Sequence, residues 1–176
     1  MSTGSAQVSM PSMIQVTAPG SAASISEVLA LMGVWRSHGE VIALCQGCFD
    51  PLHLGHALHF HEVRERCDRL IVSVGADAHV DRGEGRPLLG DHLRARMVAE
   101  LRVVDAVVIN RAASAVQMIR SLQPDIFAKG VDYQGSADTA LLAEQRAISD
   151  VGGRFLLTGS TKFSATRIAQ AVGVWV

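Results

Sequence analysis

The residue types best suited to chemistry lie in the segment GCFDPLHLGH, residues 47–56, directly after an apolar run. His53 and His56 stand three positions apart, and Gly55 between them brings no side chain that could clash. Imidazole groups can supply hydrogen bonds and positive charge as negative charge builds on a phosphoryl group. This spacing therefore predicts a site at which two histidines converge on one phosphate.

Two backbone features favour the same ligand. Gly47 falls at the end of the apolar run, where a glycine lets the backbone approach a ligand closely. A helix that begins near His56 would direct its free amide groups and the positive end of its dipole toward the loop. We therefore expect an anion at this position.

A metal site is the first alternative, because His53, His56, His59 and His61 lie within nine residues. On a helix, positions 56 and 59 lie roughly on one face, whereas 61 is turned well away from both. No cysteine or carboxylate follows at a standard zinc spacing. We therefore expect no metal held by protein ligands, and we interpret His59 and His61 as surface or interface histidines.

The cysteines suggest a redox pair, since Cys45 and Cys48 form a C-x-x-C motif. However, Cys45 lies inside the apolar run, and on an extended chain the two sulfur atoms would point to opposite faces. We expect Cys45 in the core and a backbone role for Cys48. With Cys67 the count is three, which argues against a disulfide framework and for a reducing compartment, so we expect the cytoplasm.

Further polar residues follow later apolar runs. Arg82 and Arg86 belong to a glycine-rich stretch, Lys129 to AKGVDY, and Lys162 to STKFSATRI. The chain has fourteen arginines but only these two lysines. Because flexible ammonium groups could bind phosphate oxygens, we expect both lysines to act at the site.

The elements that must position these residues alternate along the chain. Apolar runs predict strands near 41–46, 69–76, 106–110, 126–130 and 154–159. Helical periodicity predicts helices near 25–39, 56–67, 91–101, 114–122, 139–152 and 164–172. The order predicts an α/β fold, a single domain with a doubly wound, Rossmann-like, five-stranded parallel sheet. Ligands of such sheets bind at the carboxyl ends of the strands, where all the segments named above fall.

Composition excludes several classes of function. Of 176 residues, 48% are hydrophobic and 19% charged, with a net charge of −1, so no broad basic surface predicts nucleic-acid binding. No apolar run is long enough to span a membrane. Residues 1–24 are rich in Ser, Gly, Ala and Pro, and we expect a disordered leader before a nucleotidyltransferase domain over 25–176.

That domain assignment comes from a resemblance. The sequence resembles the nucleotidyltransferase superfamily marked by the H-x-G-H motif, here His53-Leu54-Gly55-His56. Within it, the chain is most similar to the adenylyltransferase domain of bifunctional heptose-phosphate kinase/adenylyltransferases, and next to glycerol-3-phosphate cytidylyltransferase. The similarity extends over residues 25 to 172 and includes GEGRP, LRVVDAVV, LQPDIFAKGVDY and AISDVGGRF.

The resemblance implies direct attack of a substrate phosphate oxygen on the α-phosphorus of a nucleoside triphosphate, with release of pyrophosphate. His53, His56 and Lys129 would be catalytic, Mg²⁺ would arrive with the triphosphate, and the protein would be a homodimer. The nucleotide-binding set would be Gly47, Cys48, Phe49, Asp50, Gly55, Arg82, Arg102, Gly130, Asp132, Lys162, Ser164 and Thr166.

Departures from the family pattern leave alternatives open. Arg82 stands where relatives usually carry a lysine, in a shorter loop, and Ala165 replaces a hydroxyl residue. We expect transfer of AMP from ATP to a sugar phosphate such as heptose 1-phosphate. One alternative is a CTP-dependent enzyme acting on glycerol phosphate, another polyol phosphate or a phosphonate. The other is a nucleotide-binding regulator without turnover.

Overall fold

A computed structural model describes residues 23–80, 83, 85–133 and 138–159 of the chain. The predicted leader lies outside this range except for Ala23 and Ser24. The predicted last helix, with Lys162, Ser164 and Thr166, also lies outside the described residues, as does Arg82.

The sheet has five parallel strands in the spatial order β3-β2-β1-β4-β5. The strands are β1 (Ile42–Gly47), β2 (Arg69–Gly75), β3 (Ala106–Asn110), β4 (Ile126–Lys129) and β5 (Arg154–Leu157). The strand order reverses beside β1, which pairs with β2 on one side and β4 on the other. This confirms the predicted doubly wound parallel sheet.

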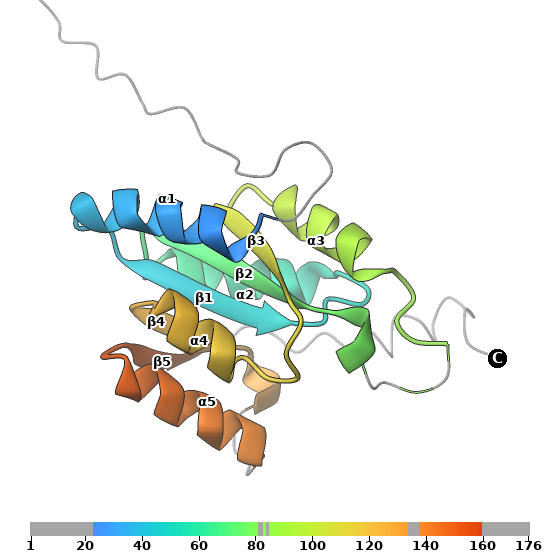
Figure 1. The fold of residues 1–176 in the computed structure, drawn as a ribbon. Helices are drawn as coiled ribbons and strands as arrows, with labels where there is room; N and C mark the ends of the chain where they lie inside the picture. The colour runs from blue at the N-terminus through green and yellow to red at the C-terminus, as the bar shows by residue number, and fades with distance from the viewer. Residues whose placement is uncertain (1–22, 81–82, 84, 134–137, 160–176) are drawn as a thin grey trace, which may run out of the picture.

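The described residues also form five helices and two short 3₁₀ turns. The helices are α1 (Ile25–Ser37), α2 (Leu54–Arg64), α3 (Asp91–Ala99), α4 (Val116–Leu122) and α5 (Thr139–Asp150). The turns are η1 (Asp77–His79) and η2 (Val131–Tyr133). Figure 1 shows α1, α4 and α5 in front of the sheet and α2 behind it. None of the described helices combines the length and apolarity needed to cross a membrane.

Apolar side chains form one core on each face of the sheet. Phe127 of β4 joins residues of α1, α4 and α5 in the first core. Its neighbours Ile126 and Ala128 join residues of α2 and α3 in the second. Successive strand residues point to opposite faces, so Lys129 must point to the face of Phe127, away from α2.

The first helix begins where the sequence predicted. Ser24 is its N-cap, and its hydroxyl accepts a hydrogen bond from the Glu27 amide at 3.3 Å. The Glu27 carboxylate accepts in return from the Ser24 amide at 2.7 Å, which completes a capping box. Val28, Met32 and Trp35 are its buried residues.

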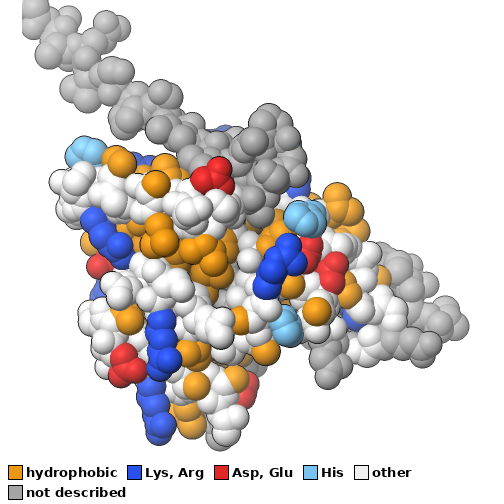
Figure 2. Space-filling view, viewed as in Figure 1, with side chains coloured by type: hydrophobic (Ala, Val, Ile, Leu, Met, Phe, Trp, Pro, Cys, Tyr) orange, Lys and Arg blue, Asp and Glu red, His pale blue; other side chains and the backbone are white. Residues whose placement is uncertain are grey.

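Lys and Arg side chains are scattered over the face in Figure 2, while hydrophobic side chains gather between α1 and α4. On this face, therefore, no continuous basic surface forms of the kind that nucleic acid requires.

Candidate phosphate-binding site

The two histidines of the motif lie against each other at the start of α2. Their rings stack with centroids 3.8 Å apart and an angle of 16° between the planes. His53 is the N-cap residue, and both side chains are half-buried. The structure thus brings the pair together at a helix N-terminus, where amide groups and the helix dipole favour an anion.

A backbone hydrogen bond selects the tautomer of His56. Its Nδ1 accepts from the His53 amide at 3.3 Å, so in this arrangement the ring proton is carried by Nε2. A neutral imidazole with this tautomer still offers one N–H donor. With this tautomer, the N–H donor of the His56 ring is at Nε2.

Phe49 supports the pair from beneath. It adopts a left-handed backbone conformation, with φ of 55°, and its ring meets that of His56 edge-on at 5.0 Å. The same ring covers Gly47: a Cβ atom at position 47 would lie 2.9 Å from Phe49 Cζ. Gly47 is required here because a side chain would displace the aromatic ring on which His56 rests.

The carboxylate of Asp50 is fully engaged within the chain. It is buried and pairs with Arg86 at 2.7 Å, and it accepts from the amides of Leu88 and Leu89 at 2.9 to 3.1 Å. Burial alone would raise the pKa of Asp50, but these hydrogen bonds and the Arg86 charge together lower it. Asp50 therefore fastens the glycine-rich stretch to the loop that follows β1, and its contact with nucleotide stays a prediction.

Arg94, which sequence reasoning missed, ties the same loops together. Its side chain has no exposed surface and donates to the carbonyl oxygens of Cys48, Gly75 and Leu89. It also forms an ion pair with Asp77 at 2.6 Å. One guanidinium group thus joins the carboxyl ends of β1 and β2 to the start of α3. The sequence could have indicated that Arg94 is buried, because it lies one residue before Ala95 and four before Val98, on the buried face of α3.

Gly130 is placed beside the loop that follows β1. The register pairs Cys45 of β1 with Ala128 of β4, so Gly130 lies level with Gly47 across the two strands. The strand order of the sheet reverses between these strands. In doubly wound folds the ligand crevice forms at this point, outside the carboxyl ends of the strands.

Lys129 is not placed with the histidines, and its catalytic role stays a prediction. Its side chain is 6% exposed and pairs with buried Glu144 of α5 at 3.0 Å. Its ammonium group also lies 4.7 Å from the ring centroid of Tyr133. The reason is strand alternation, which directs Lys129 to the face covered by α4 and α5, whereas His53 and His56 lie on the α2 side. The side chain of Asp132 lies outside what the structure describes.

Arg102 lies away from the histidine pair within the chain, and its contact with nucleotide stays a prediction. It is exposed in the turn between α3 and β3 and precedes Asp105 by three residues. Asp105 accepts from the amide of Leu70, near the first residue of β2, so this turn lies at the amino edge of the sheet. The phosphate loop follows the carboxyl end of β1. Within one chain, therefore, the length of a strand separates Arg102 from the site.

His59, which we predicted to be a surface or interface histidine, is buried within the chain. It is 9% exposed, and its Nδ1 lies 2.7 Å from the hydroxyl oxygen of Thr158. Burial lowers the pKa of His59 to about 4. The nearby Glu62 charge raises this pKa, whereas the Lys129 charge lowers it further. His61, by contrast, is exposed as expected.

All three cysteines are free thiols. Cys45 is fully buried, and burial raises its thiol pKa. The Cys48 carbonyl accepts from Arg94, and the expected backbone contact of Cys48 with a ligand stays a prediction. Among the described residues, no three His, Cys, Asp or Glu side chains gather so that they could hold a metal ion.

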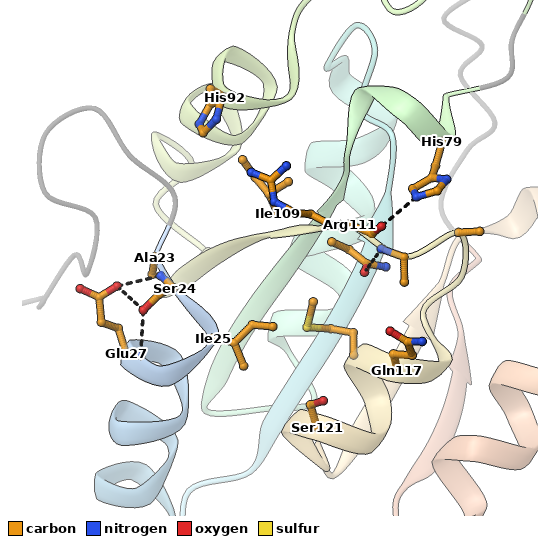
Figure 3. Close-up of a pocket in the computed structure, with 14 residues that line it drawn as sticks. Ala23, Ser24, Ile25, Glu27, His79, His92, Ile109, Arg111, Gln117 and Ser121 are labelled. Carbon is orange, nitrogen blue, oxygen red and sulfur yellow. Dashed lines mark hydrogen bonds between the residues drawn. The ribbon is translucent and has the colours of Figure 1, made fainter.

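A separate pocket of about 780 Å³ lies between α1 and α4 at edge strand β3. Figure 3 shows Arg111, His79 and Gln117 around it, with Nε2 of His79 2.8 Å from the Arg111 carbonyl oxygen. Its α1 and α4 walls belong to the face opposite α2. The pocket and the histidine pair are therefore distinct features of the molecule.

Comparison with known proteins adds independent information. Residues 44–170 match the cytidylyltransferase-like family, a span that contains the histidine pair and the Arg94 cluster. Among solved structures, the lipopolysaccharide core biosynthesis protein from Thermoplasma volcanium is similar, with a TM-score of 0.56 and 28% identity. The similarity covers 72% of this chain and 100% of that one.

Curated relatives are larger proteins. The bifunctional protein HldE of Mesorhizobium japonicum is 38% identical over 134 residues, which is 75% of this chain and 26% of the relative. The protein of the same name from Granulibacter bethesdensis is 43% identical over 117 residues, or 65% of this chain and 24% of the relative. The similar region spans about a quarter of each of these relatives.

Proposed function

Because this chain belongs to the cytidylyltransferase-like family of nucleotidyltransferases, we propose that it transfers AMP from ATP to a sugar phosphate such as heptose 1-phosphate, releasing pyrophosphate. The observation that carries the proposal is the stacked His53–His56 pair at the N-terminus of α2. The choice of AMP and heptose is supported by the similarity to bifunctional relatives and by the resemblance to heptose-phosphate adenylyltransferase domains.

In the proposed reaction, an oxygen of the acceptor phosphate attacks the α-phosphorus while the bond to the pyrophosphate oxygen breaks. No covalent bond to the protein forms. Negative charge grows on the phosphoryl oxygens in the transition state, and the Nε2–H group of His56 donates to them. The amide groups at the start of α2 add positive potential that requires no reorganisation.

We also propose that Mg²⁺ binds together with the triphosphate. The one carboxylate of the loop, Asp50, is saturated by Arg86 and two amides, and histidine nitrogens are poor ligands for a hard cation. Oxygen atoms of the triphosphate and water therefore suit Mg²⁺ better than this loop does. When bound, the ion would neutralise charge on the triphosphate and its pyrophosphate leaving group. We further propose that the reaction takes place in the cytoplasm and that the enzyme is a homodimer.

The test is a screen for pyrophosphate release with each of the four ribonucleoside triphosphates and Mg²⁺. The acceptors are heptose 1-phosphate, a hexose 1-phosphate, glycerol 3-phosphate and a phosphonate. We expect release with ATP and a sugar 1-phosphate. Preference for CTP with glycerol phosphate or a phosphonate would overturn the choice of nucleotide and acceptor. Tight nucleotide binding without release for any acceptor would instead indicate a regulator.

A further inference from the structure

A buried ion pair joins strand β4 to helix α5. Lys129 is the last residue of β4, and its ammonium nitrogen lies 3.0 Å from a carboxylate oxygen of Glu144. The two side chains are only 6% and 5% exposed. Taking two charges out of water is costly, and well-packed apolar side chains of similar volume often stabilise a protein at least as well. Stability alone therefore gives little reason for an ion pair at this place.

The carboxylate of Glu144 also holds the start of α4. Its other oxygen accepts a hydrogen bond from the Ala115 amide at 3.2 Å. Ala115 is the N-cap residue of α4 and is buried. Figure 1 shows α4 and α5 side by side on one face of the sheet. One carboxylate thus links α5 both to the end of β4 and to the segment that leads from β3 into α4.

The ammonium group of Lys129 lies between two aromatic rings. Its nitrogen is 5.3 Å from the ring centroid of Phe127 and 4.7 Å from that of Tyr133. A cation within about 6 Å of an aromatic ring centroid is attracted by the ring, and more strongly when water is excluded. Tyr133 is the last residue of η2. The Lys129 side chain therefore holds η2 against the end of β4.

The turn held in this way borders the ligand crevice of a doubly wound sheet. Gly130 connects Lys129 to η2, and it lies level with Gly47 across β1 and β4. The Gly130 carbonyl accepts from the Tyr133 amide at 3.1 Å, which closes the turn. A Cβ atom added at position 130 would meet no described atom within 4 Å, so its backbone is open on that side. The contacts of the ion pair thus converge on a turn beside the loop that follows β1.

We propose that Lys129 and Glu144 form a positioning pair that holds the Gly130–Tyr133 turn where it contacts the nucleoside triphosphate. The inference rests on the proposed function, which requires a nucleotide in this crevice. Both side chains are buried on the face covered by α4 and α5, away from the histidine pair. They act through the turn that they hold and do not touch the reacting atoms.

The test measures steady-state pyrophosphate release by four variants and the unmodified protein. Lys129→Met removes the ammonium group at similar length, and Glu144→Gln removes the charge but keeps an oxygen for the Ala115 amide. The double variant removes both charges, so no unpaired charge stays buried if a single variant fails to fold. Asp150→Asn is the matched control, because its exposed ion pair with Arg120 also joins α4 and α5.

We expect the double variant, and each single variant that folds, to raise KM for the nucleoside triphosphate about tenfold, the scale of weakening roughly one hydrogen bond. The value of kcat with saturating substrates and KM for the acceptor should stay within about twofold, since a positioning pair for the nucleotide changes binding rather than chemistry. Asp150→Asn should leave all three constants unchanged, because an exposed ion pair contributes little.

Two outcomes would overturn the inference. One is a fall in kcat of about a hundredfold that is confined to the variants lacking Lys129, since this would indicate a catalytic lysine. The other is an unchanged triphosphate KM in the double variant, even if urea denaturation shows altered stability, because a merely structural pair would behave in this way. Failure of the proposed function looks different, because the unmodified protein itself would then release no pyrophosphate.

Discussion

At the level of single residues, the site depends on a few side chains whose partners select their role. His53 and His56 stack at a helix start, while His59, three residues further on, is buried against Thr158. All three are histidines on one short segment, yet only the first two lie where an anion would be favoured. The contacts that each histidine makes, rather than its residue type, therefore distinguish the His53–His56 pair from His59.

Removing His56 tests this distinction. We expect His56→Ala to lower kcat about a hundredfold or more, the scale of losing one donor that acts on transition-state charge. The measurement is pyrophosphate release with saturating substrates. His61→Ala is the control, since His61 is exposed on the same helix and should retain near-normal activity. If both variants were equally active, the phosphate-site assignment would fail.

At the level of elements, one arginine of α3 holds together the loops that follow β1 and β2. Arg94 is fully buried and supplies hydrogen bonds to three backbone carbonyls and to Asp77. Buried carbonyl groups without partners are costly, so this side chain is worth more than an ordinary surface arginine. It makes α3 a support for the phosphate loop even though α3 contributes no residue to the histidine pair.

Arg94→Leu should therefore destabilise the protein by about 3 kcal/mol or more, because several acceptors lose their donor at once. It should also lower turnover, since the Cys48 carbonyl next to Phe49 loses its restraint. Urea unfolding monitored by circular dichroism measures the first effect. The control is Arg96→Leu on the same helix, whose exposed ion pair with Glu100 should contribute only about 0.3 to 0.5 kcal/mol. Equal losses in both variants would contradict the role of Arg94.

At the level of the whole molecule, two buried groups contribute to how stability depends on pH. His59 has a pKa lowered to about 4 from 6.5, so between these values the unfolded chain binds a proton that the folded chain excludes. The contribution of His59 to the free energy of unfolding is fully present above pH 6.5 and decreases as the pH falls toward 4. Asp50, with a lowered pKa, contributes stability above its ordinary pKa of 3.8 that is lost at still lower pH.

We therefore expect the free energy of unfolding to fall by up to about 3 kcal/mol between pH 6.5 and pH 4 on account of His59. Urea titrations at half-unit pH intervals provide the measurement. His59→Asn cannot titrate in this range, so its curve should be flatter there while the loss at lower pH remains. A His59→Asn curve as steep as that of the unmodified protein would contradict the assignment.

The sequence by itself determined the fold class and the proximity of His53 and His56. Continuous apolar strands and helical periodicity are local patterns, so they predicted the strands and helices of the described residues to within a few positions. The proximity of His53 and His56 could also be predicted, because a helix start and a three-residue spacing bring the two residues together without any contribution from distant segments.

Only the tertiary structure decided the partners of the remaining polar residues. Asp50 binds Arg86, Lys129 binds Glu144, Arg94 reaches three loops, and His59 meets Thr158. Each of these contacts joins segments far apart in the sequence, and a polar side chain that is buried must find whichever partner the packing brings to it. The place of Arg102 was decided in a related way: a parallel sheet has two edges, and Arg102 lies in the turn at the amino edge.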